Sequence, residues 1–148
     1  MSATDNYIAI TRLEHAYADV VNRRAWPELA TLFDANAPIR IDTVTNPVVE
    51  VVGPTALGEF IGNAIERFEF FEFAILSVHV ELEQDVARAR LYMCELRQER
   101  ATGEFSRAFG LYRDRFERFE GRWQFAARKY QSLARTGGEV FEFPEEIW

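Results

Sequence analysis

The second half of the chain constrains the fold most, because four long segments with strand character follow one another there. They are rich in Phe, Tyr and Leu, and short turns separate them, the last of which is the two-residue step Glu120-Gly121. Segments joined in this way predict an antiparallel meander. The four predicted strands cover residues 73–82, 86–97, 106–119 and 123–133.

The first half of the chain has helical periodicity. Apolar side chains recur at three- and four-residue steps over residues 5–22, and again in a short helix that begins near Pro27. A third helix follows Thr55, with an apolar stripe that runs from Leu57 to Phe68. Two short strands are predicted between the second and third helices, over residues 39–45 and 48–52.

Helices that precede a meander within 148 residues predict a single α+β domain over residues 1–148, with the helices on one face of the sheet. Residues 137–148 form a C-terminal tail that combines apolar side chains with glutamates. We expect this tail to pack on the body, either over a pocket mouth or across a subunit interface, because its apolar content is high. The apolar residues are Val140, Phe141, Phe143, Ile147 and Trp148.

The charge of the chain argues against several partners. A net charge of −7 disfavours nucleic acid and anionic membranes, since both require a basic surface. Six arginines between positions 107 and 128 are interleaved with acidic residues, which predicts a solvated face of mixed charge. No apolar run is long enough to span a bilayer, and the N-terminus does not resemble a signal peptide. A cytoplasmic location is therefore expected.

The inventory of ligating residues is small. A lone cysteine, Cys94, excludes an internal disulfide and is expected to be buried and inert. Two histidines and one cysteine offer no zinc set, and no glycine-rich phosphate loop follows a strand. The sequence predicts that the protein requires no metal and no other cofactor.

His79 is the first candidate for chemistry. Strict alternation through residues 73–82 places His79 on the same face as Phe73, Ile75 and Ser77, a mixed polar and aromatic face typical of a ligand cavity. A neutral imidazole in such a pocket can act as a general base near pH 7. The alternative is a core histidine with both ring nitrogens hydrogen-bonded.

Tyr17 and Glu95 are the two further candidates. Tyr17 lies on the apolar stripe of the first helix, so its phenol points inward and needs a hydrogen-bond partner. Glu95 shares a strand face with Leu91 and Met93. If that face lines a pocket, the carboxylate can orient His79; the alternative is an exposed carboxylate paired with Arg97.

The order of elements and a set of motifs resemble the NTF2-like superfamily, and within it the SnoaL-like group. The resemblance covers residues 10–133 and implies a conical domain whose curved sheet and long helix enclose a mostly apolar pocket. Members include scytalone dehydratase, bile-acid 7α-dehydratase and ketosteroid isomerase, and also non-catalytic binding and assembly modules. The motifs are Tyr17, Trp26, Leu32-Phe33, Gly53, His79, Asp85-x-Ala87, Gly110-x-Tyr112-x-Asp114 and Gly121-x-Trp123 with Arg128.

The resemblance implies roles for these candidates. His79 would remove a proton, Glu95 would orient His79, and Tyr17 together with Asn22 would hold the substrate oxygen. Asn22 stands where the dehydratases carry an acidic residue. Asp42 invites comparison with the base of ketosteroid isomerase, but the spacing is one residue longer, so we expect its side chain to point outward unless a bulge intervenes. Asn22 and Asp42 are kept as substrate-binding candidates.

The expected function is that of a cofactor-independent lyase, dehydratase-like, or an isomerase that acts on a hydrophobic cyclic or aromatic small molecule by His-assisted proton transfer. The alternative is a non-catalytic small-molecule-binding or assembly module of the same fold. The large apolar area of the meander, together with the resemblance, predicts a homo-dimer or homo-trimer.

Overall fold

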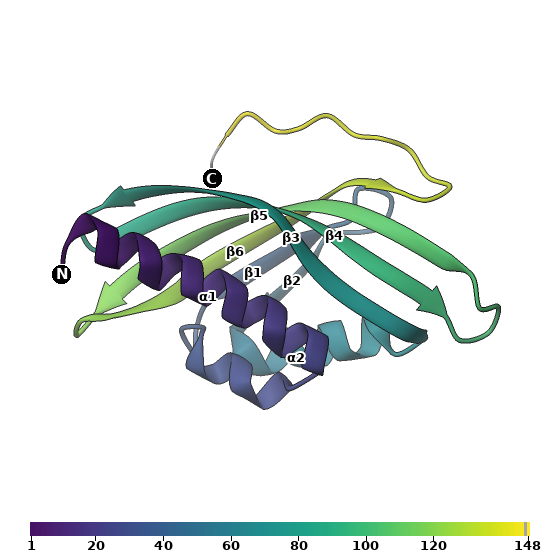
Figure 1. Cartoon of the computed structure of the whole chain (residues 1–148), viewed down its shortest axis with the longest axis horizontal. Helices are drawn as coiled ribbons and strands as arrows, with labels where there is room; N and C mark the ends of the chain where they lie inside the picture. The colour runs from purple at the N-terminus through teal and green to yellow at the C-terminus, as the bar shows by residue number, and fades with distance from the viewer. Residues whose placement is uncertain (147) are drawn as a thin grey trace.

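A curved sheet of six strands dominates the computed structural model, which describes residues 1–146 and 148 (Figure 1). The strands lie in the order β2-β1-β6-β5-β4-β3. The elements are α1 (Ala3–Arg23), η1 (Trp26–Thr31), β1 (Pro38–Asp42), β2 (Val49–Val52), α2 (Gly53–Ile65), β3 (Phe68–Glu83), β4 (Val86–Glu99), β5 (Phe105–Phe119) and β6 (Arg122–Arg135).

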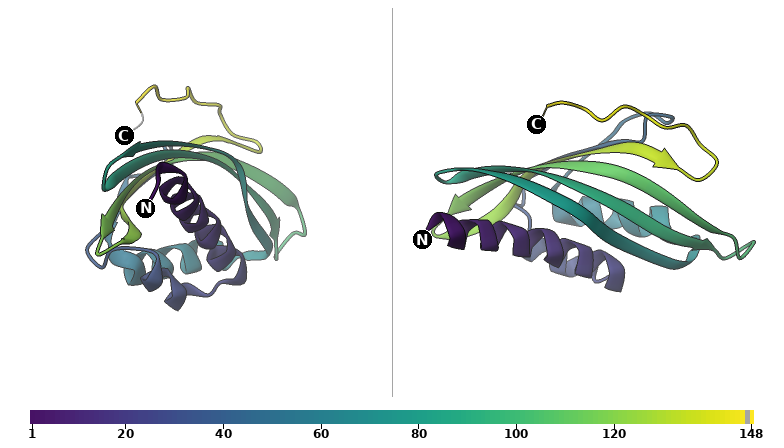
Figure 2. Two further views of the ribbon diagram at one scale, coloured as in Figure 1. Left: turned by 60° about the vertical axis from the view of Figure 1, so that its left-hand side comes forward. Right: turned by 45° about the horizontal axis from the view of Figure 1, so that its top comes forward.

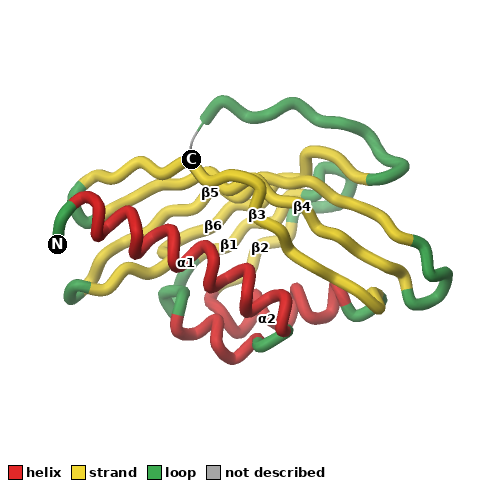
Figure 3. Tube along the Cα trace, viewed as in Figure 1, coloured by secondary structure: helices red, strands yellow, loops and turns green. Residues whose placement is uncertain are grey.

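Strands β3 to β6 form the predicted antiparallel meander. Strand β1 runs parallel to β6, and β2 pairs with β1 as its antiparallel neighbour. The helices lie together on one side of the sheet, as Figure 3 shows with helices in red and strands in yellow. In the left view of Figure 2 the sheet arches over α1. The predicted α+β class, with helices packed on a curved, mainly antiparallel sheet, is confirmed.

Helix α1 is defined at both ends by its sequence. Ser2 and Asp5 form a capping box at its start, and Arg24 ends it in the left-handed conformation with φ 55°. Its apolar stripe, with Ile10, Tyr17 and Val21, is buried against the concave face of the sheet. This helix therefore forms one long wall of the space beneath the sheet.

Helix α2 and the short 3₁₀ helix η1 pack against each other, and α2 also contacts β1 and β2. Trp26 packs against α2 at two glycines, Gly58 and Gly62, where an added Cβ would lie 3.1 Å from the tryptophan side chain. Helix α2 ends at Ile65, so the expectation that its stripe continues to Phe68 is wrong. Phe68 instead opens β3, because this part of the chain pairs with the end of β4.

Strand β3 contains a bulge that reverses the facing of its second half. The pairing passes from Ile75 opposite Met93 to Ser77 opposite Tyr92, so Leu76 is an extra residue. From Phe71 to Ile75 the odd-numbered side chains point to the concave face. Beyond the bulge the even-numbered ones do.

Strand β6 contains a bulge of the same kind. Ser132 lies opposite Gly110, whereas Ala134 lies opposite the preceding residue of β5, Phe109, so Leu133 is the extra residue. The side chain of Arg135 therefore faces the same side of the sheet as Ser132, although the two are three residues apart.

The tail after β6 crosses the outer face of the sheet (Figure 1). The Phe141 amide donates to the Leu133 carbonyl at 2.8 Å, and the Phe143 ring stacks on Tyr92 with centroids 5.7 Å apart. Trp148 receives the Lys129 ammonium over its ring at 4.3 Å. Ile147, which was expected to contribute to this packing, lies outside the described residues.

No helix among the described residues is both long enough and apolar enough to cross a membrane.

Candidate functional site

A cavity of about 290 Å³ lies between the concave face of the sheet, α1 and α2. Its wall combines apolar and aromatic side chains with polar groups that converge on the interior. The apolar lining includes Val21, Ile39, Ile41, Leu57, Phe60, Ile61, Ile65, Phe68, Phe71 and Phe73, and the polar lining includes Tyr17, Thr43, Asn46, Arg67, Glu95, Arg97, Tyr112, Arg128, Tyr130 and Arg135.

The polar lining is arranged in rows across the sheet, because paired residues on neighbouring strands point to the same side. The first row pairs Asp114 with Arg128, and the second pairs Tyr112 with Tyr130. A later row runs from Glu95 through Ala108 to Arg135. The rows lead from a closed end at Arg128 towards an open end, where Arg67 has 63% of its side chain exposed.

A buried ionic cluster forms the closed end. The Arg128 guanidinium donates to Asp114 through Nε at 2.6 Å and through a terminal nitrogen at 2.8 Å, and to Glu14 of α1 at 3.2 Å. All three side chains are fully shielded from solvent. The guanidinium also lies over the rings of Tyr17 and Tyr112, at 4.1 Å from each centroid.

Two carboxylates thus share one guanidinium at the closed end. Burial, reinforced by the charge of Asp114, raises the pKa of Glu14 well above its usual value, while Arg128 opposes the rise. Oε1 of Glu14 and the second terminal nitrogen of Arg128 have no hydrogen-bond partner within the described part of the chain. Glu14 is therefore the carboxyl that most readily holds a proton here.

Three tyrosines occupy the middle of the cavity. The Tyr112 ring lies between those of Tyr17 and Tyr130, with centroid distances of 6.0 and 5.0 Å. Gly110 makes room for Tyr130, because a Cβ at that position would lie 2.4 Å from the tyrosine ring. The Tyr130 hydroxyl accepts a hydrogen bond from Ser132 at 3.2 Å.

The tyrosines keep their protons at neutral pH. Burial, and then the charge of Glu95, raises the pKa of Tyr130 to about 12. Burial also raises the pKa of Tyr17, and it raises that of Tyr112 further. All three hydroxyls therefore carry a proton that they can donate, and those of Tyr17 and Tyr112 also interact with each other.

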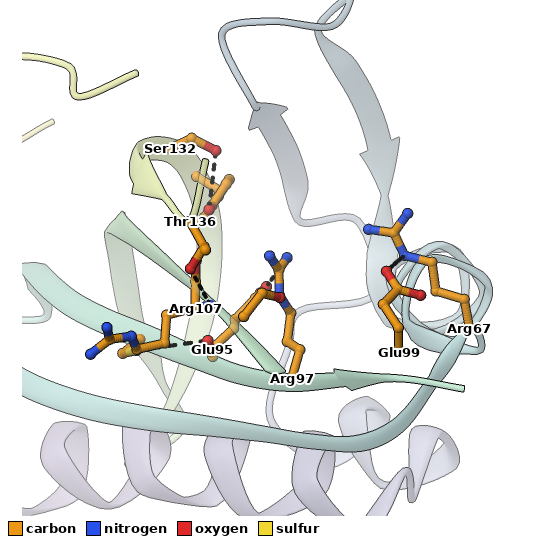
Figure 4. A network of polar contacts seen from close by, with 10 residues as sticks. Arg67, Glu95, Arg97, Glu99, Arg107, Ser132 and Thr136 are labelled. Atoms are coloured by element: carbon orange, nitrogen blue, oxygen red, sulfur yellow. Dashed lines mark hydrogen bonds and ion pairs between the residues drawn. The ribbon is translucent and has the colours of Figure 1, made fainter. Parts of the chain in front are cut away.

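Glu95, a residue of β4, lines the same cavity as the three tyrosines. Its carboxylate is 3.7 Å from an Arg97 nitrogen, and Figure 4 shows the two side chains next to each other. Burial raises the pKa of Glu95, while the charges of Arg97 and Arg135 oppose the rise. Glu95 is thus a half-buried carboxylate with donors on one side and cations on the other.

The structure places Tyr17 and Glu95 in the cavity lining, but it places His79 elsewhere. The His79 side chain is 64% exposed on the outer face of the sheet, with Nε2 3.5 Å from Glu81. The prediction that His79 faces the cavity is wrong, because the bulge at Leu76 interrupts the alternation on which it rested.

Asn22 and Asp42 also lie outside the cavity lining. The Asn22 amide donates to the Phe73 carbonyl at 3.2 Å and accepts from the Phe73 amide at 2.6 Å, so it fastens α1 to β3. Asp42 accepts from the Val44 amide at 2.8 Å and lies 3.6 Å from Arg40. Its outward register agrees with the spacing argument, since Ile41 and Thr43 are the residues of this segment in the lining.

Several residues of the site were not identified from the sequence. Glu14 had a detectable signal, since it falls between Ile10 and Tyr17 on the apolar stripe of α1, where a charge is unusual. Arg128 was expected on a solvated face of mixed charge, yet it is 1% exposed. Arg135 had no such signal, because its inward direction depends on the bulge at Leu133.

Comparisons with known proteins agree with this architecture. A family model described as SnoaL-like domain matches residues 2–129. No curated protein gives a significant sequence match. Each of the solved structures described next is less than 25% identical to the chain, so the likeness concerns the fold.

A type 2 hexachlorocyclohexane dehydrochlorinase, LinA, has a TM-score of 0.80 at 17% identity, with 97% of each chain covered. The type 3 LinA of Novosphingobium barchaimii has a TM-score of 0.79 at 18% identity, with 95% of this chain and 97% of that chain covered. A scytalone dehydratase-like protein of Novosphingobium aromaticivorans has a TM-score of 0.76 at 17% identity, with 93% of this chain and 91% of that chain covered.

Proposed function

The chain belongs to the SnoaL-like domain family, and on that premise we propose that it is a cofactor-independent lyase or isomerase for a small hydrophobic cyclic compound. One observation carries the proposal: Glu95, a carboxylate with a pKa raised by burial, lies in the same cavity as three tyrosine hydroxyls. The dehydratase and dehydrochlorinase activities named for structural neighbours are eliminations and are consistent with it.

Glu95 replaces His79 as the proposed base. An ionised carboxylate in a partly apolar cavity can take a proton from a carbon next to a carbonyl group. A raised pKa brings the carboxylate closer to the basicity that such a transfer needs, and protonated Glu95 can then return the proton. Return to a different carbon completes an isomerisation. Loss of a leaving group from the adjacent carbon completes an elimination.

The tyrosines are the proposed donors to the oxygen that gains charge. Removal of a proton next to a carbonyl converts that oxygen into an oxyanion, and preorganised donors stabilise it. Tyr17, Tyr112 and Tyr130 remain protonated at neutral pH and line the cavity on the side of Glu95 that leads to Arg128. The charge of Arg128 beneath Tyr17 and Tyr112 favours negative charge on the substrate oxygen.

A non-catalytic binding module is the second candidate, and the Glu95–Arg97 contact favours it. A guanidinium 3.7 Å away stabilises the ionised carboxylate and so makes it a weaker base. In that case the cavity would bind a ligand without proton transfer.

Proton abstraction can be measured without knowledge of the substrate. The protein is incubated in D₂O with small cyclic ketones, namely cyclohexenone, 1-indanone and 1-tetralone, and deuterium uptake next to the carbonyl is followed by NMR. We expect exchange above the solvent rate, and a loss of about 10²–10⁴-fold in Glu95→Gln, the usual contribution of a positioned base.

The matched control is Glu81→Gln, which removes a carboxylate on the outer face of the sheet beside His79. This variant, and His79→Gln, should exchange at the parental rate. Exchange no faster than in buffer would favour the binding module. A Glu95→Gln variant with full exchange activity would reject Glu95 as the base.

A further inference from the structure

The open end of the cavity is unusually rich in guanidinium groups. Three arginines, Arg67, Arg97 and Arg135, line it, although the chain as a whole carries a net charge of −7. They come from three separate parts of the chain: the turn before β3, β4 and β6. Burial first, and then the charges of Arg135 and Arg67, lower the pKa of Arg97, which indicates that these cations lie close together.

The local carboxylates do not neutralise these cations. Arg67 lies 3.5 Å from Glu99, and Arg97 lies 3.7 Å from Glu95 (Figure 4). No hydrogen bond or ion pair joins the Arg135 guanidinium to another residue in the described part of the chain. Three guanidiniums thus face two carboxylates, which leaves one positive charge in excess.

The geometry leaves space beside Arg135. Ala108 separates Glu95 from Arg135 in their common row across the sheet, and its side chain is a single methyl group. Arg97 is held in place by its own contacts: its Nε donates to Ser106 at 3.2 Å, and its guanidinium lies 5.1 Å from the centre of the Phe68 ring. A fixed guanidinium with unused nitrogens is suited to a planar carboxylate.

We propose that the ligand of this cavity carries a carboxylate, which binds between Arg97 and Arg135 at the open end, while the apolar ring of the ligand points inward towards the tyrosines. This inference rests on the proposed use of the cavity as a small-molecule site and specifies the class of molecule. Between the Arg128 cluster and the open end the cavity wall is mainly aromatic and aliphatic, so the ligand is an amphiphile with one charged end.

A matched pair of probes tests the proposal. Binding of 3-phenylpropanoate and of its neutral amide, 3-phenylpropanamide, is measured by isothermal titration calorimetry at fixed ionic strength. We expect the carboxylate to bind at least about 10-fold more tightly, the effect of one charge-assisted hydrogen bond. Arg135→Gln should reduce this preference, because it weakens binding of the carboxylate more than binding of the amide.

The control is Arg40→Gln, which removes an arginine of β1 that pairs with Asp42 and Glu50 outside the cavity. It should keep the full preference for the carboxylate. Equal affinity for the two probes in the wild-type protein would overturn the proposal, and so would failure of both probes to bind at about 10 mM. A preference that survives Arg135→Gln and Arg97→Gln would overturn the assignment of the arginines.

The Glu95→Gln variant separates this proposal from the proposed reaction. Loss of the Glu95 charge frees Arg97, so the variant should bind 3-phenylpropanoate at least as tightly as the wild-type protein does. Deuterium exchange should be lost in the same variant. If Glu95→Gln keeps deuterium exchange and also prefers the carboxylate probe, Glu95 is rejected as the base and the carboxylate site at Arg97 and Arg135 is retained.

Discussion

Glu95 is influenced in opposite directions by its surroundings. Burial raises its pKa, and Arg97 and Arg135 lower it. We predict that the Glu95 carboxyl, followed by ¹³C NMR, titrates above the ordinary value of 4.5, and that Arg97→Gln raises its pKa further. The sign follows from charge: removal of a nearby cation destabilises the carboxylate and leaves the protonated form unaffected.

Arg40→Gln serves as the control for this titration, because Arg40 lies outside the cavity lining. It should leave the Glu95 titration unchanged. A Glu95 pKa that falls in Arg97→Gln would show that the ion pair is not what keeps the carboxylate ionised.

Glu14 is the second carboxyl with a testable pKa. Its pKa in the folded protein is raised well above 4.5, so the folded state retains a proton that the unfolded chain has already lost. The stability that Glu14 contributes is fully present below about pH 4.5 and is lost as pH rises towards the folded pKa. Within that window the free energy of unfolding falls by about 1.4 kcal/mol per pH unit.

Glu14→Gln has no such titration, and its amide oxygen can still accept from Arg128. We therefore predict that the free energy of unfolding of Glu14→Gln, relative to wild type, increases as pH rises from 4 to 8. Urea denaturation at each pH gives the difference. A difference that stays constant or decreases over this range would contradict the raised pKa of Glu14.

At the scale of single elements, the tail is the segment whose contribution is easiest to measure. Phe143 stacks on Tyr92, and the Phe141 amide bonds to Leu133, so the tail covers part of the outer face of the sheet. We predict that deletion of residues 138–148 lowers the free energy of unfolding by about 1–3 kcal/mol, the value of one or two partly buried aromatic side chains.

None of the described tail residues lines the cavity, so the truncated protein should bind cavity ligands with parental affinity. Phe143→Ala should account for part of the lost stability. Phe119→Ala is the matched control, because Phe119 is 74% exposed and should contribute little. Unchanged stability after truncation would show that the outer-face contacts are too weak to matter in solution.

The order of the elements can be predicted from the sequence, but the direction of some strand side chains cannot. The succession of helices and strands follows from periodicity and turn residues, and the inward direction of Tyr17 follows from the stripe of α1. The side of the sheet to which His79 and Arg135 point does not follow from the pattern, because it depends in each case on one extra residue in the strand. Leu76 and Leu133 are ordinary strand residues and no glycine lies beside either, so a bulge at either position has no local signature.

The ionic cluster at the closed end shows a second limit. In the chain, Arg128 is 14 residues from Asp114 and 114 residues from Glu14, and only the finished sheet and α1 bring the three together. Charged residues are solvated in most proteins, so Asp114 and Arg128 are each best interpreted from the sequence as surface residues. Their burial is a property of the set.

At the scale of the whole molecule, association remains a prediction. The outer face of the sheet has an apolar groove beside the tail, and Leu76 and Phe143, which line it, are 59% and 63% exposed. Exposed apolar area of this kind favours self-association. We predict a homo-dimer or homo-trimer, measured as mass by light scattering at micromolar concentration. A monomeric mass would contradict it, and Leu76→Glu should shift any oligomer towards the monomer.

The bulge at Leu133 has a consequence for how such a protein can diverge. It divides β6 into an inner stretch, with Arg128 and Tyr130, and an outer stretch that ends at Arg135, and the facing of each stretch is set independently. Gain of a single codon between Ala134 and Arg135 would turn Arg135 outward and leave the inner stretch in register. One genetic step could therefore change whether the cavity entrance prefers charged or neutral molecules. Arg128 and Tyr130 would keep their places in the cavity.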